Sequence, residues 1–270
     1  MKQISILGCG WLGFPLAKSL LVKGYAVKGS TTSMEKIFML KNDGVNPFQI
    51  IVLEDSIDGN IDSFLENSSI LIIDIPPKLR GNSKENFVAK IQTLISFIEK
   101  STVEKVIFVS STSVYADDNF NVTTVTENTK ANPDSESGKQ LQEVEQLLQK
   151  NKNFQTTIIR FGGLIGEDRH PIHFLAGKKN LENPNGPINL IHQMDCIGII
   201  QKIIETNSWN ETFNAVAPYH PSRKEYYTQK AIELKLPLPE FEKNSTATGK
   251  MVSSEKVEQL LNYSFQTIPD

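Results

Sequence analysis

Three glycines near the start of the chain have the spacing of a phosphate-binding turn. Gly8, Gly10 and Gly13 fit the pattern G-x-G-x-x-G, between an apolar run and a segment expected to be helical. In such a turn the first glycine bends the backbone, the second lets a diphosphate approach, and the third lets the helix pack on a strand. The phosphate would rest on free N–H groups at the positive end of the helix dipole. The pattern predicts dinucleotide contacts at Gly8, Gly10, Trp11, Leu12 and Gly13, although packing alone also produces such turns.

The next expected strand, residues 25–30, runs into four consecutive hydroxyl residues, which are Ser30, Thr31, Thr32 and Ser33. NAD-binding folds of this kind carry an acidic residue about 20 positions beyond the glycines, where it holds the ribose hydroxyls. Hydroxyl groups stand here instead, and with Lys28 or Lys36 nearby they suit a 2′-phosphate better. We therefore expect NADP as the cofactor and NAD as the alternative. Ser33 could also serve only to cap the following helix.

These residues require elements that bring strand ends to one edge of a sheet. Further strands are expected at residues 48–53, 70–75, 106–109 and 156–161, with helices at 34–40, 87–98 and 138–148 between them. Such alternation favours right-handed crossovers and a parallel sheet covered on both faces. The fold class that we expect is therefore α/β, a Rossmann-type doubly wound parallel sheet with a small C-terminal substrate-binding lobe. Pro76 and Pro77 force a loop after the fourth strand, and we expect them to shape the nicotinamide side of the cleft.

Beyond residue 162 the alternation becomes less regular. We expect a strand at 188–191, a helix to about residue 205 that Asp195 could cap, a strand at 212–216, a helix at 222–235 that Ser222 caps, and a strand fragment with a short helix in 250–262. The predicted NAD(P)-binding domain is residues 1–165, with 188–216 returning to it. Residues 166–187 and 217–270 are predicted to form a small substrate or lid lobe.

Composition limits the classes of function. The 270 residues are 39% hydrophobic and 22% charged with a net charge of -3, which gives no electrostatic reason to expect nucleic acid or an acidic membrane as partner. No apolar run reaches the roughly 18 residues of a membrane helix, and the first strand begins too early to follow a signal peptide. Two cysteines, Cys9 and Cys196, are too few for a disulfide framework or a zinc site. We expect a cytoplasmic protein without a metal, acting on a small molecule.

Residues 111–116, Ser-Thr-Ser-Val-Tyr-Ala, resemble a motif of the extended short-chain dehydrogenase/reductase superfamily, in its NAD-dependent epimerase/dehydratase group. In that family a Ser or Thr three residues before a Val-Tyr-Gly triplet lies beside the nicotinamide and binds a substrate oxygen. Ser111 takes that place, and Ala116 replaces the glycine. Residues 158–166 and 191–195 are also similar to family segments, so the resemblance covers nearly the whole chain and implies the family's fold.

The family's Tyr-x-x-x-Lys motif is altered here. The matching window is Ser135-Glu136-Ser137-Gly138-Lys139, which keeps the lysine and replaces the tyrosine by serine. A serine hydroxyl has a pKa far above neutrality, so it cannot take over the proton transfer that the resemblance assigns to the tyrosine. Together with the Gly-Trp-Leu-Gly turn and the Ile-Pro-Pro run, this departure resembles an atypical YeeZ-like subgroup whose members also lack the active-site tyrosine.

The catalytic candidates are therefore Ser111, Lys139 and Tyr115, the nearest phenol in the sequence; Lys139 would also contact the cofactor. Ser111 could instead be a polar strand end, Lys139 a solvated helix residue and Tyr115 a structural residue. The resemblance implies a reductase or epimerase acting on a small carbonyl or hydroxyl compound or a nucleotide sugar. The alternative is a redox sensor or scaffold that binds NADP without turnover. Family members pair through two helices, here about 87–98 and 141–148, so a homodimer is expected.

Overall fold

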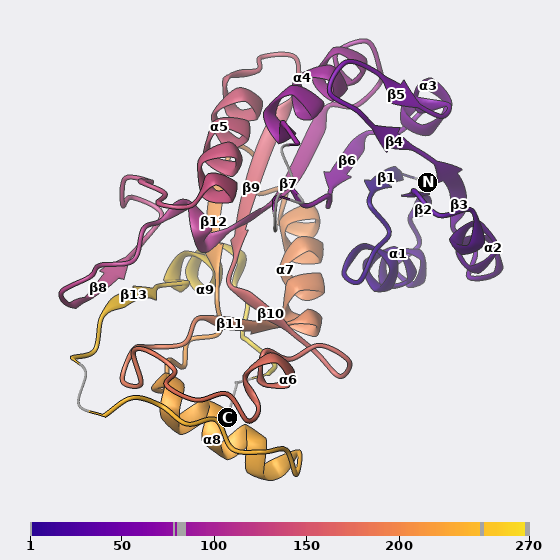
Figure 1. Ribbon diagram of the computed structural model, residues 1–270. Coiled ribbons are helices and arrows are strands. Elements are labelled where there is room, and N and C mark those ends of the chain that lie inside the picture. The colour runs from indigo at the N-terminus through magenta and orange to yellow at the C-terminus, as the bar shows by residue number, and fades with distance from the viewer. Residues whose placement is uncertain (1, 78, 80–84, 244–245, 268–270) are drawn as a thin grey trace.

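The computed structural model describes residues 2–77, 79, 85–243 and 246–267, and a seven-stranded sheet with helices on both faces forms its centre (Figure 1). All neighbouring strands in this sheet are parallel, in the order β12-β9-β7-β6-β1-β2-β3. The strands are β1 (Gln3–Leu7), β2 (Ala26–Thr31), β3 (Asn46–Gln49), β6 (Ile70–Ile73), β7 (Lys105–Ser111), β9 (Gln155–Phe161) and β12 (Thr212–Ala215). The chain reverses its direction across the sheet between β1 and β6, where doubly wound folds bind ligands. The predicted fold class is confirmed.

Side-chain alternation along the strands fills two separate cores. Ile4 and Ile6 of β1 point into one core and Leu7 into the other. The first core packs against α1 (Gly13–Val22), α2 (Met34–Asn42), α7 (Gln193–Thr206) and α9 (Glu255–Leu261). The second packs against α3 (Ile61–Leu65), α4 (Phe87–Ile98) and α5 (Glu136–Lys150). Because helices cover both faces, even the consecutive residues Leu71 and Ile72 are fully buried.

A smaller lobe extends from the sheet around an apolar core of its own (Figure 1). Its elements are β10 (Gly163–Ile165), α6 (Ile172–Leu175), β11 (Leu190–His192) and α8 (Arg223–Glu233). Tyr226 and Tyr227 of α8 pack there against Ile172 and Leu190. The Ser222 hydroxyl accepts a hydrogen bond from the Glu225 amide at 3.2 Å, so the predicted cap of α8 is confirmed.

The end of the chain returns to the main domain. This placement differs from the prediction, which assigned all of residues 217–270 to the lobe. Strand β13 (Gly249–Val252) pairs with β8 (Val122–Val125), and α9 packs with α7 in the first core. Asp195 takes part in this return and is not the predicted helix cap, because His192 Nδ1 accepts from the Met194 amide at the start of α7. The buried Asp195 carboxylate instead accepts from Tyr263 Oη at 2.7 Å and from two amides of the C-terminal tail.

The remaining elements are short. The expected strand at 48–53 is divided into β3 and β4 (Ile51–Val52), which pairs with β5 (Ile57–Asp58), and η1 (Thr112–Val114) is a single turn after β7. In the part of the chain that the structure describes, no helix combines the length and apolar character needed to cross a bilayer.

Candidate functional site

The three glycines of the turn after β1 differ in what surrounds them. A side chain at Gly8, where φ is +108°, would collide with the Asp74 carbonyl oxygen, and one at Gly13 would collide with the Gly8 carbonyl oxygen. Internal packing therefore requires both glycines. At Gly10, by contrast, no heavy atom of the described residues lies within 4 Å of an ideal Cβ position, and Gly10 is exposed. The open space at the second glycine is where a ligand would approach the backbone.

The backbone amides of the turn leave two donors for such a ligand. Cys9 N donates to Ser30 O at 2.7 Å, Gly10 N to Gly8 O at 2.8 Å, and Phe14 N to Gly10 O at 3.2 Å. Within the described residues, the amides of Trp11 and Leu12 donate to no acceptor. These N–H groups lie next to Gly10 at the N-terminal end of α1, where the helix dipole favours an anion. The residues present therefore fit a diphosphate.

Asp74, which follows β6 directly, is a site residue that the sequence reasoning missed. Its carboxyl is partly buried beside Gly13. Burial raises its pKa to about 8, against the opposing effects of the Gly13 N–H and the positive charge of Arg169. At neutral pH much of this carboxyl is protonated, so it repels an anion less than an ordinary aspartate would. An acid directly after an apolar strand is the signal in the sequence that could have revealed it.

The four hydroxyl residues lie at the end of β2 and directly beyond it, and they differ in what they contact. Ser30 is buried, and its Oγ accepts a hydrogen bond from the Gly8 amide at 2.9 Å, so it positions the glycine turn. Thr31 Oγ1 accepts from the Ser33 amide at 3.1 Å. Thr32 is exposed and Ser33 partly so. Ser33 stands at the N-cap of α2, but its side chain makes no capping hydrogen bond.

Lys28 is not available for the predicted contact with a 2′-phosphate. Its side chain is buried, and Nζ donates to the carbonyl oxygens of Ser63 and Glu66, each at 2.7 Å. These acceptors lie at the end of α3, because residue 28 faces that side of the sheet. Burial lowers the Lys28 pKa, and the charge of Glu66 opposes this effect. Lys36, on the exposed side of α2, is the cation left near the hydroxyl residues.

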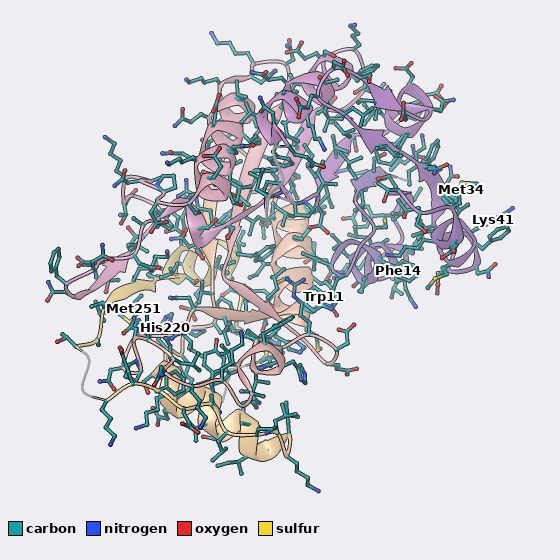
Figure 2. All side chains as sticks on the ribbon, in the orientation of Figure 1. Trp11, Phe14, Met34, Lys41, His220 and Met251 are labelled. Atoms are coloured by element: carbon teal, nitrogen blue, oxygen red, sulfur yellow. The ribbon has the colours of Figure 1, made fainter. Side chains whose placement is uncertain are left out.

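Trp11 joins the glycine turn to the segment after β10. Its indole Nε1 donates to the Asp168 carboxylate at 2.7 Å, and the Arg169 guanidinium carbon lies 4.9 Å from the centre of the ring. Gln193 Nε2 donates to the Trp11 carbonyl at 2.7 Å. A side chain at Gly166 would come within 2.8 Å of the indole. The indole thus packs on the second half of the chain (Figure 2), and the backbone N–H of Trp11 is the group that faces no protein acceptor among the described residues.

The predicted catalytic residues Ser111 and Lys139 are carried on neighbouring segments. Ser111 ends β7, and its Oγ accepts a hydrogen bond from the Ser113 amide at 3.2 Å. The first turn of α5 packs against this loop, because a side chain at Gly138 would collide with the Ser113 carbonyl oxygen. Lys139 follows directly and is exposed. Ser135, in place of the family's tyrosine, caps α5 by accepting from the Gly138 amide at 3.1 Å.

Tyr115 is held in a buried polar network. Its hydroxyl accepts from Arg160 Nη1 at 2.6 Å and donates to Asn214 Oδ1 at 2.9 Å. Arg160 is itself paired with the Glu145 carboxylate at 2.6 Å. Burial raises the pKa of the Tyr115 phenol, and the charge of Arg160 opposes this effect. The arrangement is that of a structural residue, so the hypothesis of Tyr115 as an acid receives no support from it.

Comparison with known proteins places the chain among its relatives. Protein YeeZ of Escherichia coli (strain K12) is 32% identical over 273 residues, which cover 98% of this chain and 96% of YeeZ. The chain belongs to the YeeZ family. No protein-family model matches it.

Solved structures share the fold of this YeeZ-family protein at low sequence identity. UDP-glucuronic acid 4-epimerase from Bacillus cereus in complex with NAD has a TM-score of 0.79 at 19% identity, covering 99% of this chain and 94% of that chain. A short-chain dehydrogenase/reductase superfamily protein from Agrobacterium tumefaciens with bound NAD has a TM-score of 0.78 at 17% identity, covering 99% and 93%. The fold is that of this superfamily, as the sequence motifs imply.

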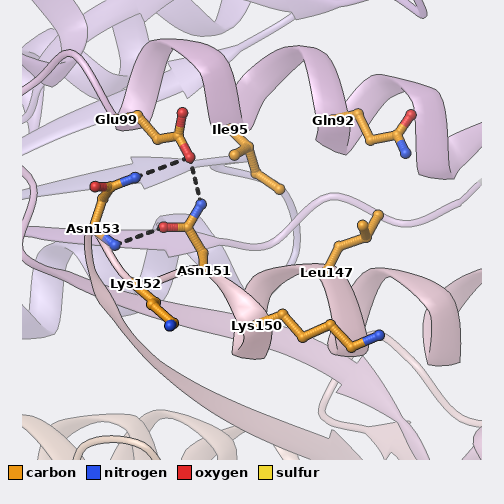
Figure 3. Close-up of a pocket in the computed structure, with 8 residues that line it drawn as sticks. All are labelled: Gln92, Ile95, Glu99, Leu147, Lys150, Asn151, Lys152 and Asn153. Carbon is orange, nitrogen blue, oxygen red and sulfur yellow. Dashed lines mark hydrogen bonds between the residues drawn. The ribbon is translucent and has the colours of Figure 1, made fainter.

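A surface hollow of about 420 Å³ lies elsewhere, between α4 and the end of α5 (Figure 3). Glu99 Oε1 accepts there from Asn151 Nδ2 at 2.7 Å and from Asn153 Nδ2 at 3.1 Å. Ile95 and Leu147 line the same hollow. It contains none of the predicted site residues of this YeeZ-family protein, and it lies on the two helices through which the family resemblance predicts pairing.

Proposed function

We propose that this YeeZ-family protein binds a nicotinamide dinucleotide at the glycine turn and acts on a small carbonyl or hydroxyl compound, such as a nucleotide sugar. The observation that carries the proposal is the open space at Gly10 beside the amides of Trp11 and Leu12. Two neighbours in fold support it, because both solved structures contain NAD and one is a UDP-glucuronic acid 4-epimerase. The main domain proposed for the cofactor is residues 1–165 with 188–216, and its strands β10 and β11 also contribute side chains to the core of the lobe.

Within this proposal we favour NADP over NAD. Thr32, Ser33 and Lys36 are the groups beyond β2 that could meet a 2′-phosphate, and no carboxylate stands among residues 28–34 to hold a pair of ribose hydroxyls. Titration calorimetry with NADPH and NADH checks this choice. Tighter binding of NADH would reverse it.

The chemistry is divided between the cofactor and the chain. A bound nicotinamide supplies or accepts hydride. Ser111 would orient the substrate oxygen through its hydroxyl, and Lys139, at the start of α5, would contact the nicotinamide ribose. Pro76 and Pro77 would shape this end of the cleft. With Ser135 occupied as a helix cap, the proton would come from water or from a residue of the lobe, and loss of a positioned acid typically costs about 10²- to 10⁴-fold in rate.

The Ser135 cap also favours a second function, binding of the dinucleotide without turnover. In that case the protein would be a redox sensor or scaffold. A panel of nucleotide sugars and small aldehydes with NADPH, followed by nicotinamide absorbance, separates the two functions. Turnover that Ser111→Ala abolishes supports the enzyme, and binding without turnover across the panel supports the sensor.

Substitution of Gly10 tests the binding site itself. Gly10→Val places a side chain in open space, outside the left-handed region of φ, so we expect the melting temperature of the free protein to stay unchanged. The same side chain would occupy the volume of the diphosphate, so we expect binding of NADPH and NADH to weaken at least about 100-fold. Calorimetry measures the affinity and circular dichroism the fold. Unchanged affinity in a folded Gly10→Val would contradict the proposed site.

A further inference from the structure

Arg169 of the segment after β10 carries a positive charge to the glycine turn. Its guanidinium carbon lies 4.9 Å from the centre of the Trp11 ring, and Trp11 immediately follows Gly10. The Arg169 side chain is exposed and makes no hydrogen bond or ion pair with the other described residues. Its charge also acts on Asp74, whose carboxyl borders Gly13. The contact with the Trp11 ring thus places a cation beside the turn, and its electrostatic effect on Asp74 agrees with that position.

The backbone of the segment fixes this position. Gly166 N donates to Arg169 O at 2.9 Å, and Arg169 N donates back to Gly166 O at 3.2 Å, which closes a tight turn. The Asp168 carboxylate holds the turn against the indole N–H at 2.7 Å. The close approach of Gly166 to the indole leaves no space for a side chain there. Arg169 is therefore positioned from the start of the lobe toward the cofactor site of the main domain.

The negative charges at the turn, once a diphosphate is bound, favour a cation beside it. A diphosphate bound on the amides of Trp11 and Leu12 would lie near the Asp168 carboxylate, whose negative charge opposes a second anion. The positive charge of Arg169 offsets that repulsion. A guanidinium is planar, always charged and able to donate two parallel hydrogen bonds to a phosphate, so it suits this position better than a lysine would.

We propose that Arg169 binds the diphosphate of the dinucleotide, so that the segment after β10 completes a site begun by the glycine turn. This inference rests on the proposed function. It assigns a phosphate-binding arginine that lies far in sequence from the G-x-G-x-x-G pattern. It also makes the Trp11–Asp168 hydrogen bond a positioning contact, because that bond keeps Arg169 over the turn.

The test is titration calorimetry of NADPH and NADH with the full chain and three variants, at low and high salt. Arg169→Ala should weaken binding on the order of 10- to 100-fold, because a charge-assisted hydrogen bond to phosphate is lost. Arg169→Lys should give an intermediate affinity, since it keeps the charge and loses the planar donor pair. Lys224→Ala, which removes one exposed positive charge from the same lobe, is the matched control and should bind like the wild type.

Salt gives a second readout. Added salt should weaken binding of the wild type more than binding of Arg169→Ala, because screening acts on the contact that the variant lacks. Circular dichroism confirms that each variant is folded, and Arg169→Lys keeps the test available if the alanine variant unfolds. Affinity of both Arg169 variants within about twofold of the wild type overturns the inference and leaves the proposed function intact. A wild type that binds none of the dinucleotides overturns both.

Discussion

At the scale of single residues, the protonation of the Asp74 carboxyl makes the site depend on pH. Burial raises its pKa to about 8, whereas an unfolded chain releases this proton near pH 3.8. The titratable neighbours are the thiols of Cys9 and Cys196 and the guanidinium of Arg169. Burial raises the pKa of Cys9 to about 12 and that of Cys196 far above its usual value, so neither thiol ionises over the same interval.

Replacement of Asp74 should change the pH dependence of stability. From about pH 4 to about pH 8 the folded state keeps a proton that the unfolded chain has lost, so this group makes stability fall as pH rises. Asp74→Asn removes that dependence. Near pH 4 we expect the variant to melt at about the same temperature as the wild type. At pH 8 we expect its unfolding free energy to exceed that of the wild type by a few kcal/mol, since one pKa unit corresponds to about 1.4 kcal/mol. Thermal and urea unfolding at a series of pH values measure it.

Asp118→Asn is the control for that prediction. The backbone N–H groups of Phe120 and Asn121 lower the pKa of this exposed carboxyl, so its contribution to stability has the opposite sign. The control should therefore show no gain at pH 8. If Asp74→Asn and the wild type gave parallel pH profiles, the raised pKa of Asp74 would be refuted.

At the scale of elements, one buried ion pair fastens α5 to the middle of the sheet. Arg160 of β9 is paired with Glu145 of α5 at 2.6 Å, and Ser110 of β7 donates to the same carboxylate at 2.6 Å. Tyr115, after β7, accepts from the other side of the guanidinium. Ser111 ends β7 and Lys139 lies in the first turn of α5, so this network fixes the position of the two elements that carry these catalytic candidates.

Loss of one charge from this network should destabilise the fold without removing the cofactor site. Glu145→Gln leaves a buried Arg160 without its counter-charge, so we expect the unfolding free energy to fall by about 3–5 kcal/mol. Urea denaturation measures the loss. The double variant Glu145→Leu, Arg160→Met should lose less than Glu145→Gln, and a larger loss in the double variant would contradict the ion-pair explanation. NADPH affinity, measured in the folded state, should stay near the wild-type value.

The elements that the sequence predicted are those with strong periodicity. Helix α4 has the predicted bounds because Phe87, Ile91, Leu94 and Ile98 repeat at helical spacing and are buried. Strand β8, whose first three residues are exposed, has no apolar alternation to reveal it. The hydrogen-bond partners of buried polar side chains could not be predicted from the periodicity of the sequence. Lys28 and Asp195 bind groups that are 38 and 68 residues away, and only tertiary packing brings these groups near.

The same reason limited prediction of the site at the scale of the whole molecule. The glycine turn could be predicted because its residues are consecutive and the backbone conformation demands glycine. Asp74 and Arg169 lie in segments that follow other strands, β6 and β10, so their proximity to the turn depends on the sheet order and on the start of the lobe. The departure at Ser135 could be predicted from the motif, whereas its capping of α5 could be found only from the structure.

The predicted homodimer can be tested by comparing the surface on α4 and α5 with α2, one of the elements that carry exposed apolar side chains. Ile95 and Leu147 line the hollow between α4 and α5, where the family resemblance predicts pairing, while Phe38 on α2 is 73% exposed. An apolar side chain that stays in water in the monomer favours burial in an interface. We expect a homodimer through α4 and α5, because both helices can meet their symmetry copies across a two-fold axis.

Charge substitutions distinguish these surfaces. In a two-fold dimer, Leu147→Glu buries a negative charge near the same charge of the partner protomer, so we expect the dimer to dissociate. Light scattering after size exclusion should then give the monomer mass. Phe38→Glu makes the same kind of change on α2 and should leave the dimer intact. Dissociation by Phe38→Glu alone would move the interface to α2, and a monomeric wild type at high concentration would reject pairing altogether. Because Leu147 lies near the end of α5, whereas Lys139 lies at its start, and no residue of the glycine turn lines the hollow, the monomeric Leu147→Glu should still bind NADPH with wild-type affinity.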